Sequence, residues 1–269
     1  MLLKISKLAK STYYYHINQL ETDKNRTEKE IIKEIFELNK SRYGYRRITI
    51  ALRQQGYIVN HKKVLRLMKI LGLKGKQKKN KYKSYKGQVG KVAPNILDRD
   101  FKATKPFEKL ATDVTEFAVC DEKVYLSPIL DMFNNEMLSY SISLSPNFAQ
   151  TREMLNKLFR VLPKDAKPIL HSDQGWQYQM REYQEQLRQN NIIQSMSRKG
   201  NCLDNACAEN FFGVLKSELY YIKEKEYKNI QELEKDIIEY IEYYNNRRIK
   251  SKLKGMSPVQ YREHSMLVA

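Results

Sequence analysis

Hydrophobic residues in the first third of the chain recur every three or four positions, which is the spacing of amphipathic helices. Thr27 and Glu30 have the spacing of a capping box at the start of one such helix. Asn60 precedes another helix, and Gly72 follows its last apolar residue. The pattern therefore predicts a small unit of helix-turn-helix character, with helices over three stretches: 27–39, 45–55 and 61–71.

From Phe107 onward the pattern changes to short apolar or alternating runs, which are typical of strands. Three strands joined by short connections are followed by alternating helices and strands. The expected strands are 110–119, 123–131, 136–144, 168–172 and 192–194, and the expected helices are 147–161, 178–189, one carrying Glu209, and 231–244. Without further information, this order predicts a mixed α/β domain.

Charge is distributed unevenly along the chain, whose net charge is +18. Residues 1–105 contain 27 Lys and Arg against 8 Asp and Glu, whereas residues 106–269 contain 22 against 23. A basic front favours a polyanionic partner, and nucleic acid is favoured over a membrane surface because the basic residues alternate with tyrosine and apolar helical positions. The three cysteines lack the spacing of a metal site, and no apolar run is long enough to span a membrane.

The predicted helix over 61–71 carries basic residues on the face opposite its apolar stripe. A recognition helix would direct such residues toward phosphates and the major groove, and a solvated helix face is the alternative. The candidate DNA-binding residues of this unit are Arg46, Arg47, Lys62, Lys63 and Arg66. Residues 74–104 form a linker rich in lysine and tyrosine, which suits either nucleic-acid contact or a passive tether.

Three acidic residues stand where strands and a helix can bring them together. Asp113 lies in the run L-A-T-D-V-T, Asp173 follows a short apolar strand, and Glu209 comes after 35 intervening residues. Taken singly, Asp173 is typical of a turn and Glu209 of a solvent-facing helix position. Converged carboxylates repel one another and usually need a cation between them, and hard oxygen ligands suit Mg²⁺ or Mn²⁺.

Several motifs together carry a family resemblance that covers nearly the whole chain. They are A-T-D-V-T, H-S-D-Q-G-W-Q-Y, S-R-K-G-N-C-L-D-N-A, Lys216 seven positions after Glu209, and the tail Y-N-N-R-R-I-K-S-K-L-K-G-M-S-P. The chain resembles a DDE transposase of the retroviral-integrase superfamily, and more narrowly the second-reading-frame protein of insertion sequences in the IS-three group. It departs from the pattern at Asn210, where serine is common, and at Lys250, where histidine is frequent. Neither departure touches the carboxylates.

The resemblance implies a ribonuclease-H-like integrase core with a mixed five-stranded sheet, preceded by the helix-turn-helix-like domain. It also implies that Asp113, Asp173 and Glu209 are catalytic and ligate metal during DNA strand cleavage and strand transfer. Two Mg²⁺ or Mn²⁺ ions per site would serve this chemistry, and no ATP is expected. The alternatives are a metal-dependent nuclease of the same fold and a catalytically inactive DNA-binding regulator.

Further polar residues near the three acids are candidates for supporting roles. Lys216 shares a helix face with Asn205 and Glu209 and is expected to contact DNA, as are Arg198, Lys199 and Asn201 in the preceding loop. Asp131 is the strongest competing carboxylate, Asp204 is a candidate helix cap, and His171 is expected to be a structural hydrogen-bonding residue.

The predicted organisation has five segments: a basic stub over 1–26, the helical domain over 27–73, a basic linker over 74–105, the catalytic core over 106–225, and a C-terminal helix with a basic tail over 226–269. The expected partners are element-end and target DNA, further copies of the chain on that DNA, and an upstream-frame protein or fusion. We expect a cytoplasmic, nucleoid-associated bacterial protein with no membrane partner.

Overall fold

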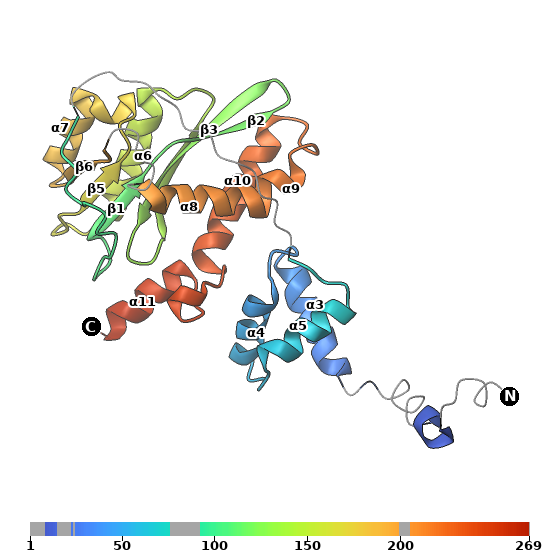
Figure 1. Ribbon diagram of the computed structural model, residues 1–269. Helices are drawn as coiled ribbons and strands as arrows, with labels where there is room; N and C mark the ends of the chain where they lie inside the picture. The colour runs from blue at the N-terminus through green and yellow to red at the C-terminus, as the bar shows by residue number, and fades with distance from the viewer. Residues whose placement is uncertain (1–8, 15–22, 24, 76–91, 199–204, 269) are drawn as a thin grey trace. The chain divides into compact units, whose positions relative to one another are not determined.

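The computed structural model describes residues 9–14, 23, 25–75, 92–198 and 205–268 (Figure 1). The chain divides into two compact units, Met1–Lys76 and Gln77–Ala269. The finer division into five segments stays a prediction. Lys199, Asn201 and Asp204 lie outside the described residues. In the part of the chain that the structure describes, no helix is long and apolar enough to cross a membrane.

The first unit is helical, as the apolar spacing predicts. Its helices α3 (Arg26–Leu38), α4 (Tyr45–Gln54) and α5 (His61–Ile70) pack against one another through one apolar face each. Asn60 caps α5 as expected, because its side chain accepts the Lys62 N–H at 2.8 Å. The predicted capping box is wrong, since Asn25 occupies the cap position of α3 and forms no side-chain cap hydrogen bond.

The described residues of the second unit contain a six-stranded mixed sheet (Figure 1). Its strands are β1 (Lys109–Thr112), β2 (Thr115–Val119), β3 (Glu122–Asp131), β4 (Met137–Ser143), β5 (Ile169–Ser172) and β6 (Ile193–Met196). The strands β1, β2 and β4 all pair antiparallel with β3, while β5 pairs parallel with both β1 and β6. The unit is therefore the ribonuclease-H-like α/β domain that the resemblance implies.

The prediction of one continuous strand over 110–119 is wrong, and the sheet has six strands where five were expected. The chain leaves the ladder at Asp113, whose carboxylate accepts the Val114 N–H at 2.7 Å and so removes that amide from strand pairing. Ser127 and Pro128 of β3 lie opposite the interruption, and proline has no N–H to donate. Asp113 consequently stands at the end of β1 and not within a strand.

Helices cover both faces of this sheet. On one face, α6 (Phe148–Val161) and α7 (Arg181–Gln189) bury apolar residues against Leu110, Ile129 and Leu170. A 3-10 turn, η1 (Trp176–Gln179), precedes α7, so the helix predicted over 178–189 is divided. On the other face, α8 (Ala206–Leu215) packs against β1 and β3, and Leu97 joins Ala111 and Met132 in a second cluster.

The chain continues from α8 without a loop into the π-helical turn η3 (Lys216–Tyr220) and α9 (Tyr221–Lys223). Loops then separate the later helices, which are α10 (Ile230–Asn246), η4 (Ser251–Leu253) and α11 (Pro258–Val268). The helix α10 packs against β3, β4 and η3. The C-terminal region is thus part of the second compact unit.

A buried ion pair joins η3 to the end of α10. The guanidinium of Arg248 donates hydrogen bonds to the two oxygens of Glu218 at 2.9 and 2.7 Å, and the Tyr240 hydroxyl donates another at 3.0 Å. Arg248 is 4% exposed and Glu218 is 3% exposed. Because Glu218 lies two residues after Lys216, this pair fastens the segment that carries Lys216 to α10.

Asp131 is a structural carboxylate at the other end of the sheet from Asp113. It is fully buried and accepts the N–H groups of Phe107 at 2.8 Å and Phe133 at 2.9 Å. Its pairing partner is Leu110 near the start of β1, whereas Asp113 follows the end of that strand. Burial raises the pKa of Asp131 to about 6.

Breaking the buried ion pair is expected to destabilise the second unit strongly. Arg248→Met should lower the free energy of unfolding by about 3–5 kcal/mol, because it leaves the Glu218 charge buried without a partner. The double variant Glu218→Leu/Arg248→Met should lose less than the sum of the two single changes. Urea denaturation measures both effects, with Arg188→Met as the control, since Arg188 is in a pair whose side chains are 77% and 45% exposed. If the loss in the double variant equalled the sum of the two single losses, Glu218 and Arg248 would not stabilise each other as a pair.

The buried Asp131 carboxyl should make stability depend on pH. Its folded pKa lies above its ordinary value of 3.8, so its contribution is present below about pH 4 and is lost as the pH rises through about 6. The unfolding free energy of the wild type minus that of Asp131→Asn should therefore fall by about 2.4 kcal/mol between pH 4 and pH 7. Denaturation at the two pH values tests this, and a difference that does not vary with pH would contradict it.

Candidate active site

The strand pairing of the sheet brings Asp113 and Asp173 together. β1 and β5 are parallel neighbours, and Ala111 pairs with His171. Each aspartate lies two residues beyond that pair, so the same register places the two side by side at the carboxyl ends of their strands. This is the edge of an α/β sheet at which ligands commonly bind.

The electrostatics of the two aspartates reflect this proximity. Burial raises the pKa of Asp113 well above its ordinary value, and the negative charges of Asp173 and Glu209 raise it further. Burial also raises the pKa of Asp173, while the Gly175 N–H, donated to Asp173 Oδ1 at 2.8 Å, acts in the opposite direction. Both aspartates keep some surface exposure, so the site is open on one side.

Glu209 lies on α8 and approaches the aspartates from the helix side. Burial raises its pKa, and the charge of Asp173 adds to the shift. Within the described residues, however, no three Asp, Glu, His or Cys side chains gather closely enough to hold one metal ion together. The expected cage of three carboxylates is therefore not closed here. Glu209, like the two aspartates, is partly exposed.

The backbone around Asp173 is shaped to leave its carboxylate room. A Cβ at Gly175 would lie 2.7 Å from Gln177 Nε2 and 2.9 Å from Asp173 Oδ1, so any other residue there would crowd these two side chains. Tyr178 is fully buried behind the pair, with its hydroxyl 3.5 Å from Thr112 Oγ1. Burial raises the pKa of Tyr178, and the charges of Asp113 and Asp173 raise it further.

His171 has the structural hydrogen-bonding role that the sequence suggests. Ser195 Oγ accepts the N–H groups of Ile96 and Leu97, and it lies 2.8 Å from His171 Nδ1. The other ring nitrogen lies 3.2 Å from Ser197 Oγ, which donates to the Ser172 carbonyl at 3.1 Å. The strand that ends at Asp173 is thereby tied to β6 and to residues 96–97.

Two of the predicted DNA contacts near the carboxylates can be placed. Lys216 is partly buried, with its ammonium 5.1 Å from the centre of the Phe117 ring. Burial lowers the pKa of Lys216, while the charges of Glu116 and Asp113 raise it, so Lys216 lies beside the acidic site. Arg198 is exposed but pairs with Asp98. Lys199 and Asn201 lie outside the described residues.

The basic candidates of the first unit differ in exposure. Lys62 and Arg66 are exposed on α5, and Arg46 is exposed on α4 with its guanidinium 5.8 Å from the Tyr45 ring centre. Arg47 lies over the Tyr43 ring at 5.4 Å. Lys63 differs, because it forms an ion pair with Glu28 of α3 at 2.5 Å. Its charge is already compensated within the unit, which the helix periodicity does not reveal.

Asn205 is a polar residue whose importance the sequence does not reveal beyond its shared helix face. It precedes α8 and is 4% exposed. Its Nδ2 donates to the Thr112 carbonyl at 3.3 Å, and its buried Oδ1 has no hydrogen-bond partner within the described ranges of the chain. Thr112 is the residue before Asp113, so Asn205 stands directly beside the carboxylate pair.

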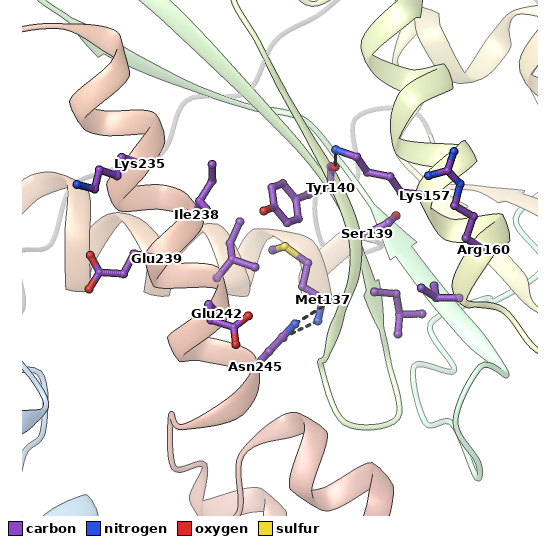
Figure 2. Close-up of a pocket in the computed structure, with 13 residues that line it drawn as sticks. Met137, Ser139, Tyr140, Lys157, Arg160, Lys235, Ile238, Glu239, Glu242 and Asn245 are labelled. Atoms are coloured by element: carbon purple, nitrogen blue, oxygen red, sulfur yellow. Dashed lines mark hydrogen bonds between the residues drawn. The ribbon is translucent and has the colours of Figure 1, made fainter.

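A pocket of about 660 Å³ lies elsewhere, where α10 meets β4 and α6 (Figure 2). Its lining combines apolar residues such as Met137 and Ile238 with the charged groups of Lys157 and Glu242. Figure 2 also shows Asn245 hydrogen-bonded to the backbone of Met137, at 3.0 and 2.9 Å. None of the three carboxylates lines this pocket.

Comparison with known proteins agrees with this architecture. Residues 22–81 match the model of an HTH-like domain, and residues 103–202 and 209–266 match models of the integrase core domain. A chain of the simian T-cell lymphotropic virus intasome, solved in complex with PP2A regulatory subunit B56 gamma, has a similar fold with a TM-score of 0.53. That likeness covers 86% of this chain and 74% of the other, at 13% identity.

Relatives with similar sequences are insertion-sequence proteins. The chain is 53% identical over 267 residues to the putative transposase InsK for insertion sequence element IS150 of Escherichia coli, covering 99% of this chain and 94% of that protein. It is 31% identical to the transposase InsF for insertion sequence IS3A of Escherichia coli, covering 88% of this chain and 82% of that protein. With an HTH-like domain before an integrase core, the chain belongs to the DDE-type transposases of the IS-three group of insertion sequences.

Proposed function

We propose that this transposase cleaves and joins DNA strands at a site formed by Asp113, Asp173 and Glu209. The observation that carries the proposal is the register of β1 and β5, which sets two partly buried aspartates side by side with Glu209 within electrostatic range. Carboxylates whose pKa values are raised by burial and by neighbouring negative charges are typical of functional sites. Competing acids are less suitable, because Asp131 is engaged with two backbone amides at the far end of β1.

The donor set suits a hard divalent cation, Mg²⁺ or Mn²⁺, and we propose two per site. Asp113 and Asp173 would hold the ions, and Glu209 would join them once α8 and the strand ends draw together. A bound pair would supply charge stabilisation for the attacking and leaving oxygens of a displacement at phosphorus. Asn205 Oδ1, which has no hydrogen-bond partner among the described residues, lies near Asp113. It could accept a hydrogen bond from water that enters the site with a cation.

The remaining side chains near the carboxylates would position DNA. The ammonium of Lys216 lies beside Asp113, where it can contact a phosphate without ligating a cation. In cleavage the attacking group is a water, and in joining it is a DNA 3′-hydroxyl. No covalent protein nucleophile is needed for either step.

DNA affinity would come mainly from the basic front of the chain. Residues 1–105 contain 27 lysines and arginines but only 8 acidic residues. Lys62, Arg66 and Arg46 are exposed on the helices of the first unit. Contact with phosphates releases counterions, which gives such binding a steep salt dependence. Assembly as a homo-oligomer on DNA, an upstream-frame partner and association with the nucleoid also remain part of this proposal.

Neutralising any one of the three carboxylates should abolish both DNA reactions. Asp113→Asn, Asp173→Asn and Glu209→Gln are each expected to reduce cleavage and strand transfer by about 100-fold or more, because several kcal/mol of charge stabilisation are lost. DNA binding should persist, since the exposed basic residues are unchanged. The assays are Mg²⁺-dependent nicking and strand transfer with element-end DNA, alongside gel-shift binding.

The control for this experiment is Asp131→Asn, which should keep both activities. In chelator, Asp113→Asn should melt no lower than the wild type, because it removes a buried charge that Asp173 repels. Full activity of Glu209→Gln would overturn the assignment of the third carboxylate. Cleavage without any joined product would favour the nuclease alternative.

The exposed basic residues of α5 should determine part of the salt dependence of DNA binding. The full-length variant Lys62→Gln/Arg66→Gln should bind more weakly and lower the slope of log affinity against log salt by about 2, since two phosphate contacts are lost. Arg188→Gln on α7 is the matched control, because it removes an exposed charge from the second unit. Fluorescence anisotropy over a salt series measures the slope, and equal slopes for all three proteins would refute the role of α5.

A further inference from the structure

The side-chain amide of Asn205 is buried, and among the described residues only its nitrogen forms a hydrogen bond. Its Nδ2 donates to the Thr112 carbonyl at 3.3 Å, while its Oδ1 has no hydrogen-bond partner among the residues that the structure describes. Only 4% of the residue is exposed, so bulk water does not compensate. Leaving a buried acceptor without a hydrogen bond costs about 1–3 kcal/mol of stability. Such an atom therefore calls for an explanation, and binding a ligand is one.

Two ordinary explanations for this amide do not apply. Asn205 occupies the position where asparagine usually caps a helix, yet its side chain makes no cap hydrogen bond to α8. Exchanging the amide oxygen and nitrogen would place Oδ1 against the Thr112 carbonyl, and two acceptors would then face each other. The observed orientation is therefore fixed by Thr112, and Oδ1 must find a donor elsewhere.

The surroundings restrict what that donor can be. Thr112 immediately precedes Asp113, so covalent geometry keeps Oδ1 beside the Thr112–Asp113 peptide. Glu209 follows one helical turn after Asn205 on α8. The acidic groups that share this space are acceptors when ionised, and the ammonium of Lys216 lies over the Phe117 ring. Water can donate to such an acceptor, and water held by a divalent cation is favoured here because the carboxylates attract the cation's positive charge.

We propose that Asn205 Oδ1 accepts a hydrogen bond from water coordinated to the divalent cation held by Asp113 and Asp173. This inference rests on the proposed function of the carboxylate pair. It makes Asn205 a positioning residue, acting on the cation through its hydration shell. Mg²⁺ keeps several waters when bound to protein, and groups that hold such outer ligands typically change metal affinity by about 10–100-fold.

The test is cation-dependent thermal melting of the full-length protein without DNA. Asn205→Leu removes Oδ1 and should weaken the affinity for Mg²⁺ and Mn²⁺ by about 10–100-fold. In chelator the same variant should melt close to the wild type, because the lost hydrogen bond to Thr112 is offset by removal of an unsatisfied buried oxygen. The readout is binding, so it does not depend on activity.

Asn134→Leu is the matched control. Asn134 is also fully buried, but its Nδ2 donates to Glu136 at 3.0 Å and to Pro258 at 2.9 Å, and its Oδ1 accepts the Glu136 N–H at 3.1 Å. Its replacement should lower the melting temperature in chelator and leave the cation affinity unchanged. The two asparagines should thus give opposite patterns.

Asn205→Asp provides a second variant that keeps an oxygen in place. The added negative charge should lower the melting temperature in chelator and enlarge the stabilisation by Mg²⁺, because it joins an acidic cluster. An unchanged cation-induced shift in this variant would overturn the inference, even if Asn205→Leu does not fold.

The remaining outcomes separate this inference from the function on which it rests. If Asn205→Leu binds cations like the wild type while Asp113→Asn does not, the role of Asn205 fails and the carboxylate site stands. If Asn205→Leu behaves like Asn134→Leu, Oδ1 binds a trapped water without a cation, and the inference fails again. If cations do not raise the melting temperature of the wild type, or raise that of Asp113→Asn equally, the proposed metal site is wrong. The inference about Asn205 then fails with it.

Discussion

The parallel pairing of β1 with β5 is the constraint on which the site depends. It fixes Asp113 and Asp173 side by side, where burial and mutual repulsion both oppose their ionised forms. Strands cannot move apart to relieve this repulsion without breaking their ladder, so the electrostatic strain stays at the edge of the sheet. Glu209 adds a third negative charge from helix α8, and its charge raises the pKa of Asp113 further. A site of this kind stores unfavourable interactions that a positive ligand can reverse.

Other contacts keep the strained edge in place from several directions. The hydrogen bonds of His171 tie the end of β5 to Ser195 and Ser197, and Gly175 leaves room for the turn that follows Asp173. On the helix side, Tyr220 both donates to and accepts from the backbone of Ala118 in β2. The ion pair of Glu218 with Arg248 then anchors the same π-helical turn to α10. The tail of the chain thereby supports the helix that carries Glu209.

Periodicity predicted the helical first unit and a mixed α/β second unit, while the core fold and the meeting of the carboxylates were implied by the family resemblance. Periodicity failed where a side chain competes with the backbone. The Asp113 carboxylate accepts the Val114 N–H and so divides a predicted strand. The predicted start of α3 failed for another reason: Asn25 stands at the cap position in place of Thr27, and local preferences define helix boundaries poorly. The pairing of Lys63 with Glu28 and of Glu218 with Arg248 joins residues distant in sequence. Such partners follow from packing, so a single chain's local pattern cannot identify them.

The separation of charge along the chain follows from the chemistry of the site. In the proposed function, clustered carboxylates repel the phosphates that they approach, and residues 106–269, with 22 basic against 23 acidic residues, have no surplus to overcome this. Screening confines each charge to a range of about 10 Å in salt, so basic groups help only when they bind the DNA directly. The basic excess lies instead in residues 1–105, with 27 lysines and arginines against 8 acidic residues. In the proposed function the carboxylates would bind cations, and this separate stretch of the chain would supply most of the affinity for DNA.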